Sequence, residues 1–176
     1  MEKRIVLGSG KLYIVAYTDT IPEDATIETD TNLIGLIQGG ATLTYTPTFY
    51  ECKDDLGLVS KKIITEEEVV LKSGILTWNG KTLEKLCATG VVTDEATTRT
   101  VKIGGVSKYD GKQYVIHFVH EDKADGDIRI TMVGSNEAGF EMAFAKDAET
   151  VINAEFKAQP MDETGTLITY KETIKG

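Results

Sequence analysis

Two histidines, His117 and His120, are the only imidazoles that could act as a base or bind a metal in this chain of 176 residues. Their three-residue spacing would place both on one face of a helix, but the surrounding segment alternates as a strand does. On a strand the two side chains point to opposite faces and cannot converge on one ion. Asp122, Asp125 and Asp127 depart from the calcium-loop spacing, and no glutamate stands at the twelfth position. We therefore predict no metal site.

A run of three glutamates that begins at Glu66 is the second candidate for chemistry. On a strand, Glu66 and Glu68 share one face, and paired carboxylates can act as general acid and base. No histidine, arginine or nucleophile motif accompanies them. Residues 8–11 end like a phosphate-binding loop, yet Ile5 stands where that motif requires glycine. We predict no catalytic and no cofactor-binding residues, and hydrolysis by Glu66 or Glu68 stays an alternative.

The chain is acidic, with a formal net charge of −9 and a sequence pI near 4.8. Such a chain repels nucleic acid and anionic membranes and lacks the basic patch typical of nucleic-acid-binding proteins. Cys52 and Cys87 suit neither a disulfide framework nor a zinc site, so we expect reduced thiols. The apolar run before Gly8 is short for a signal peptide, and no stretch reaches the length of a membrane span. We expect a soluble protein made in the cytoplasm.

Alternation with period two dominates the sequence and predicts a mainly β fold. In residues 11–17 both faces are apolar, which indicates a strand covered on both sides. Asp-Gly pairs at Asp110 and Asp125 predict tight turns, and Ser135 with Asn136 is interpreted as a further turn. The predicted strands are residues 11–17, 33–38, 41–50, 61–71, 99–103, 113–120, 128–133, 140–145, 151–158 and 166–170.

One helix is predicted after Asn79, a residue type that caps helix N-termini well. Apolar residues follow at helical spacing until Gly90, giving about ten residues. Trp78, just before the cap, is placed to pack the helix onto a sheet. Many short antiparallel strands with one helix predict a β-sandwich or barrel with a flanking helix, as a single domain over residues 1–176.

Three extended segments exceed what such a core needs. A long polar hairpin carries a protruding tip at residues 49–62, and long excursions of this kind are often functional. Residues 1–10 and 160–176 hold little that could form a core. We expect them to be N- and C-terminal arms that become ordered only between subunits.

Three stretches give the chain a likeness to a known family. The first is residues 7–14, Leu-Gly-Ser-Gly-Lys-Leu-Tyr-Ile, a short arm that enters a strand. The second runs from residues 37–41 through the polar hairpin to residues 66–71 and the helix after Trp78. The third is residues 155–167, a closing strand, turn and tail. In this order the chain resembles the major tail tube proteins of long-tailed bacteriophages and related phage-like injection systems.

The resemblance implies a structural virion protein with no enzymatic activity. Its subunits would close hexameric rings that stack into a hollow tail tube around a tape-measure protein, between terminator and baseplate proteins. DNA would pass through the lumen without specific binding, and the acidic charge agrees with such a wall. The tip residues expected to contact the next ring are Phe49, Tyr50, Lys53, Asp54, Asp55, Leu56 and Leu58. Glu66 and Glu68 are the candidates for an acidic lumen.

A monomeric β-sandwich that binds a ligand such as carbohydrate is the alternative from a different class. It would need an exposed aromatic platform, which Tyr45, Phe49 and Tyr50 could supply. These residues lie where the resemblance places the contact between rings, so the same side chains serve either hypothesis.

Overall fold

The computed structural model describes residues 5–174 and has a mainly β fold with an antiparallel sheet of eight strands. The sheet order is β2-β1-β7-β8-β9-β4-β3, and β10 pairs with β8 beside this path. A separate two-stranded sheet is formed by β5 and β6. The strands are β1 Lys11–Ala16, β2 Leu33–Gly35, β3 Ile37–Lys53, β4 Ser60–Ile75, β5 Val91–Asp94, β6 Arg99–Lys102, β7 Tyr114–His120, β8 Ile128–Asn136, β9 Ile152–Gln159 and β10 Thr169–Glu172. The helices are α1 Asp24–Ile27, α2 Gly80–Leu86 and the 3-10 turn η1 Val106–Lys108.

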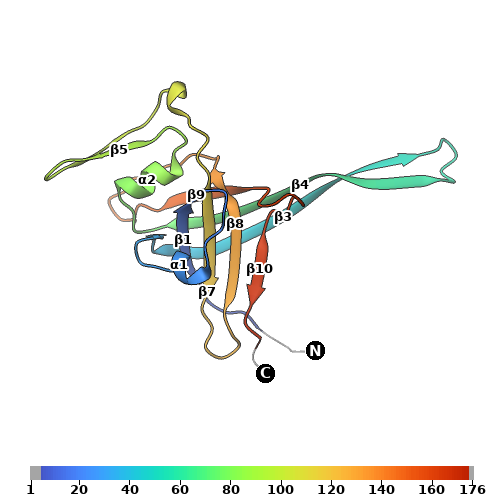
Figure 1. Cartoon of the computed structure of the whole chain (residues 1–176), viewed down its shortest axis with the longest axis horizontal. Helices are drawn as coiled ribbons and strands as arrows, with labels where there is room; N and C mark the ends of the chain where they lie inside the picture. The colour runs from blue at the N-terminus through green and yellow to red at the C-terminus, as the bar shows by residue number, and fades with distance from the viewer. Residues whose placement is uncertain (1–4, 175–176) are drawn as a thin grey trace.

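Strand β8 joins two groups of strands that cross each other (Figure 1). One side of β8 pairs with β7, while the other side pairs first with β10 and then, from Val133, with β9. Gly134 lies at this crossing, where a Cβ atom would come within 2.0 Å of the carbonyl oxygen of Lys157. Only glycine lets the two backbones approach so closely. The strands β9, β4 and β3 can therefore cross over β1, β7 and β8 as the second layer of a sandwich.

The main core fills the space between these layers and is closed at one end by α2. Leu12 and Ile116 enter it from one layer, Leu71 and Phe156 from the other, and Leu86 from α2. A smaller cluster lies on the opposite face of β1, β7 and β8 beneath α1; it contains Tyr13, Ile27, Val115, Val119 and Val133. These strands are thus covered on both faces, as the apolar alternation of residues 11–17 predicts.

Helix α2 begins where the sequence predicts. The Asn79 side chain accepts hydrogen bonds from the backbone of Lys81 and Thr82, and the Thr82 hydroxyl accepts from the Asn79 backbone in return. Trp78 packs against the main core and donates its indole N–H to the carbonyl of Thr150 at 3.2 Å. The mainly β fold with a flanking helix is confirmed. No helix in residues 5–174 is long and apolar enough to cross a membrane.

Four local predictions need correction. Residues 140–145 form no strand; they run irregularly beside the core, to which Phe140 and Met142 add partly buried side chains. Ser135 and Asn136 belong to β8 and do not form a turn. Strand β5 and the one-turn helix α1 are additional elements. Strand β10 pairs with β8 of its own chain, so the expectation that the C-terminal arm orders only between subunits is wrong for Thr169–Glu172. The same expectation for the N-terminal arm is wrong at Ser9, whose carbonyl oxygen lies 2.7 Å from Nδ1 of His120 in the same chain.

Candidate assembly surfaces

The hairpin of β3 and β4 leaves the sandwich and projects far from the body of the molecule (Figure 1). Strand β4 pairs with β9 only from Val70 to Ile75. From Ser60 to Val69, β3 is its only strand partner within the described residues, and β3 itself ends the sheet. An isolated two-stranded hairpin is marginally stable in water, and open strand edges readily pair with another chain. The projecting part therefore offers two open edges to a partner.

An extra residue in β4 shifts the register of the projecting part. Thr48 pairs with Glu66, but Phe49 pairs with Ile64, which leaves Thr65 as a β-bulge. The Thr65 hydroxyl donates to the carbonyl of Thr48 at 3.3 Å. Such a bulge increases the local twist and sets which side chains of the bulged strand share a face with its partner.

One face of the hairpin continues the main core outward as an apolar stripe. Tyr45 pairs with the core residue Val69, and Phe49 follows on the same face opposite Ile64. Tyr45, Phe49 and Ile64 are all exposed. Lys62 lies over the Phe49 ring, with its Nζ 4.3 Å from the ring centroid. Exposed aromatic and aliphatic side chains in a row, beside open edges, are typical of a surface that another protein covers.

The other face of the hairpin is polar from Thr44 to Thr48, where the two predicted lumen residues lie, and carries the exposed Tyr50 and Ile63 nearer the tip. Glu66 pairs with Thr48 and Glu68 with Thr46, so both carboxylates share this face with a row of threonines. The Glu68 carboxylate forms an ion pair of 2.8 Å with Lys157 of β9. The assignment of this face to a lumen stays a prediction.

The turn at the tip of the hairpin combines charge with exposed leucines. The Asp54 carboxylate accepts hydrogen bonds from the backbone N–H of Val59 at 2.7 Å and of Leu56 at 3.3 Å. These donors, above all Val59, lower the pKa of Asp54 and hold the turn together. Leu56 and Leu58 are 80% and 79% exposed. All seven residues predicted to contact the next ring lie on this hairpin, and their contacts stay a prediction.

This geometry gives little support to the two alternative functions, carbohydrate binding and hydrolysis. Tyr45 and Phe49 share one face of the hairpin, but Tyr50 lies on the other because neighbouring strand residues alternate. The three rings therefore do not form one flat platform for a sugar. Glu68 is held by Lys157 on an open strand surface rather than in a cleft.

An ion cluster beneath α1 gives no signal in the sequence, because its members lie far apart along the chain. Glu28 follows α1 and accepts from Arg129 through both oxygens, at 2.6 and 3.2 Å. Asp24 accepts from Lys171 of β10 at 2.6 Å. His117 is fully buried; its ring nitrogens lie 2.8 Å from the Thr131 hydroxyl and 3.2 Å from Glu28.

This cluster brings Asp24, Glu28 and His117 within 4.8 Å of one another, a spacing that could suit a metal ion. Arg129 and Lys171 already neutralise the two carboxylates and lower the pKa of each. Burial lowers the pKa of His117 and favours its neutral form. We therefore assign the cluster to structure: it fastens α1 and β10 to β7 and β8.

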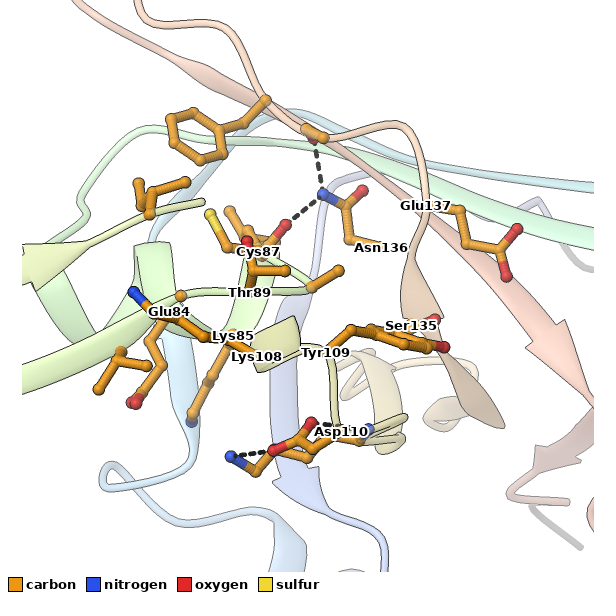
Figure 2. Close-up of a pocket in the computed structure, with 18 of the residues that line it drawn as sticks. Glu84, Lys85, Cys87, Thr89, Lys108, Tyr109, Asp110, Ser135, Asn136 and Glu137 are labelled. Carbon is orange, nitrogen blue, oxygen red and sulfur yellow. Dashed lines mark hydrogen bonds and ion pairs between the residues drawn. The ribbon is translucent and has the colours of Figure 1, made fainter. Parts of the chain in front are cut away.

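A cavity of about 600 Å³ lies beside the C-terminal end of α2. Figure 2 shows Cys87, Tyr109 and Asn136 meeting there from three separate segments. The Asn136 amide donates to the carbonyls of Leu86 at 2.9 Å and Gly139 at 2.6 Å, which ties β8 to α2. The sequence gives no sign of this cavity, because its walls come from α2, from strands β5, β7 and β8 and from loops that only the tertiary fold brings together.

The walls of the cavity are apolar enough to perturb neighbouring groups. Burial lowers the pKa of Lys85, whose ammonium donates to the carbonyl of Ile14 at 3.1 Å. Burial also raises the pKa of the Cys87 thiol. Both shifts follow from removing the charged form from water. Leu86, Val91, Ile103 and Phe140 supply aliphatic and aromatic surface to the same cavity.

No protein-family model matches the chain, and no curated protein sequence matches it.

Proposed function

We propose that this chain is a self-assembling structural subunit of the tail tube of a long-tailed bacteriophage. In this proposal, hexameric rings stack into a hollow tube around a tape-measure protein and conduct DNA during ejection, and the chain has no chemistry of its own. Terminator and baseplate proteins are its expected neighbours at the ends of the tube, and the virion tail is its expected location.

The observation that carries the proposal is the projecting part of the β3–β4 hairpin. From Ser60 to Val69 it has no second strand partner among residues 5–174, and it exposes an apolar stripe that continues the core. Open edges and exposed apolar surface destabilise a monomer in solution and favour association with further chains. Neighbouring copies would cover the stripe and pair the edges. When the rotation that relates neighbouring copies returns to the first copy, the contact closes a ring. Head-to-tail contacts that never return to the first copy give a filament.

A tip deletion tests the proposal directly. Purified wild-type protein is expected to elute as rings or longer assemblies in size-exclusion chromatography and to form tubes in negative-stain micrographs. Removing residues 53–58 should leave a folded protein, judged by circular dichroism, that no longer forms tubes. The double substitution Leu56→Ser with Leu58→Ser keeps the chain length and, like the deletion, should weaken assembly.

Val106→Ser provides the matched control. Val106 is 91% exposed and lies on η1, away from the hairpin, so its replacement removes a comparable apolar side chain and should leave assembly unchanged. A wild-type protein that stays monomeric at millimolar concentration would refute the proposal. Normal tubes from the tip deletion would refute the role of the hairpin tip.

A further inference from the structure

The cavity beside α2 and the N-terminal arm lie at opposite ends of β7. Tyr114, the first residue of this strand, lines the cavity. His120, the last residue, binds the arm: its Nδ1 lies 2.7 Å from the carbonyl oxygen of Ser9. Six residue steps at about 3.3 Å each separate the two points by about 20 Å. Figure 1 likewise shows the start of β1, which the arm precedes, at the end of the strand away from α2.

The start of the arm is fastened firmly to β7. A Cβ atom at Gly10 would come within 2.3 Å of the carbonyl oxygen of Val119, so the arm crosses β7 in close backbone contact. Lys11 and Glu121 form an ion pair of 2.7 Å beside this crossing. Ser9 is therefore a fixed point from which the preceding residues extend.

Beyond this fixed point the arm exposes three consecutive apolar side chains. Ile5, Val6 and Leu7 are 73%, 49% and 78% exposed. Their burial would remove several hundred square ångströms of apolar surface from water, worth about 25 cal/mol per Å². The cavity beside α2 offers apolar surface in return through Leu86, Val91, Ile103 and Phe140, with charged side chains such as Lys108 and Glu137 among them.

The arm cannot reach the cavity of its own subunit. Ile5 lies four residues before Ser9, and an extended chain spans at most about 3.6 Å per residue, or about 14 Å. This is less than the length of β7, along which the cavity lies about 20 Å away. An arm in the cavity must therefore come from another copy.

We propose that the cavity beside α2 receives residues 5–7 from the N-terminal arm of a second copy of this chain. The inference rests on the proposed function and names one of its contacts. Because arm and cavity are different surfaces at opposite ends of one subunit, the contact is head-to-tail and propagates along a stack. A symmetric dimer that exchanged arms would end after two copies.

The native Cys87 in the cavity wall allows a direct test. Leu7→Cys in a Cys52→Ser background leaves one thiol on the arm and one in the cavity. Mild oxidation of this full-length protein should give a ladder of disulfide-linked multimers on a non-reducing gel. Mass spectrometry should find the peptide containing position 7 joined to the peptide containing Cys87.

Ile174→Cys in the same Cys52→Ser background is the matched control. Ile174 is 76% exposed and follows β10, whose last residue Glu172 pairs with Ile128, the strand partner of His120. Its thiol should give no ladder, and links of equal yield from position 174 would overturn the inference as non-specific contact. A link between position 7 and Cys87 within one chain would also overturn it, and so would closed dimers without higher multimers.

The test separates this inference from the proposed function. Tubes that form without the link between position 7 and Cys87 would overturn the arm contact and leave the tube proposal standing. The ladder with the expected peptides supports the arm contact even in dispersed protein in which no tubes are seen. Absence of the link in both tubes and concentrated dispersed protein would overturn the arm contact.

Discussion

Arg129 donates from Nε to Glu28 at 2.6 Å, and this single contact joins β8 to the end of α1 across 101 positions of sequence. A second bond, of 3.2 Å from Nη2, makes the pair bidentate. Both side chains are largely buried. The pair is therefore the centre of the ion cluster that holds α1 on the sheet, and it gives the first prediction.

Glu28→Gln should lower the free energy of unfolding by about 1–3 kcal/mol, because a largely buried guanidinium loses its bidentate carboxylate and keeps only the longer contacts with Asp127 and Asp24. Urea denaturation at pH 7 measures this change. Lys72→Gln is the control: it breaks an exposed ion pair with Glu155 at 2.8 Å, which should contribute less than about 1 kcal/mol. Equal losses in the two variants would contradict the structural role of the cluster.

Stability should fall below about pH 6.5 because of His117. Burial lowers the pKa of His117 in the folded protein, whereas an unfolded chain has a histidine pKa near 6.5. As the pH drops through this value, the histidine of the unfolded chain binds a proton while His117 in the folded protein stays neutral. The free energy of unfolding therefore decreases. The slope reaches at most about 1.4 kcal/mol per pH unit for one proton.

His117→Gln removes this titration, so the difference in free energy of unfolding between wild type and variant gives the contribution of His117. The free energies of unfolding of wild type and variant, measured in urea between pH 5 and 7.5, should converge as the pH falls. The carboxylates of Asp24 and Glu28, the guanidinium of Arg129 and the Tyr13 ring surround His117 and stay the same in both proteins. Two parallel curves would show that His117 contributes nothing to the pH dependence.

Glu66→Lys combined with Glu68→Lys tests the proposed lumen. The double change adds up to four charge units per subunit, and a wall of this charge acts on DNA phosphates within about 8 Å at physiological salt. If the polar face of the hairpin lines the lumen, phage carrying the variant should assemble but eject DNA more slowly, with a stronger salt dependence.

Glu67→Lys is the matched control for ejection. Glu67 lies on the opposite face of β4, where its carboxylate accepts from the Tyr45 hydroxyl at 2.7 Å. Because neighbouring copies are proposed to cover that face, ejection is compared only in particles whose tails assemble normally, and in these Glu67→Lys should leave ejection unchanged. Unaltered ejection in the double lysine variant would refute the lumen assignment of Glu66 and Glu68 and leave the tube proposal intact.

Asn136→Ala should destabilise the fold by about 2–4 kcal/mol, as several buried polar groups lose their partner at once. The side-chain amide donates to the carbonyls of Leu86 and Gly139, and its oxygen accepts from the Glu155 backbone at 2.9 Å. Thermal unfolding followed by circular dichroism measures the loss. Asn153→Ala, at an exposed position of β9, is the control and should change stability little.

Asn136 also shows why part of the fold was beyond prediction from the sequence. Ser-Asn is a common turn pair, and local propensity favours a turn there. In the structure the asparagine is satisfied by three segments that only the tertiary fold brings together, so a buried strand position becomes favourable. Local statistics cannot register partners that are 50 residues away.

Elements with a strong local signal were predictable, and elements that depend on tertiary contacts were not. Asn79 marks the start of α2 because its cap is formed by neighbouring residues. By contrast, α1 has four residues, too few for helical periodicity, and depends on Ile27 in the smaller core and Glu28 in the ion cluster. Residues 140–145 alternate like a strand but find no neighbouring strand edge.

The candidate surfaces also divide into those with a local sequence signal and those that depend on tertiary contacts. The hairpin could be predicted because polar turn residues separate two alternating runs around Asp54. The length of its ladder, from Ile37 to Lys53 opposite Ser60 to Ile75, exceeds the predicted strands. The walls of the cavity beside α2 come from a helix, strands and loops that are far apart in the sequence, so it could only be found in the folded chain.

The bulge at Thr65 limits how the hairpin can change in length during evolution. Each residue added to or removed from β4 on the outer side of the bulge exchanges the two faces for every side chain beyond it. Deletion of Ile63, for example, would turn Lys62 toward the face that carries Glu66 and would turn Lys61 away from it. Insertions and deletions should therefore survive in pairs, so that the reach of the hairpin varies in discrete steps.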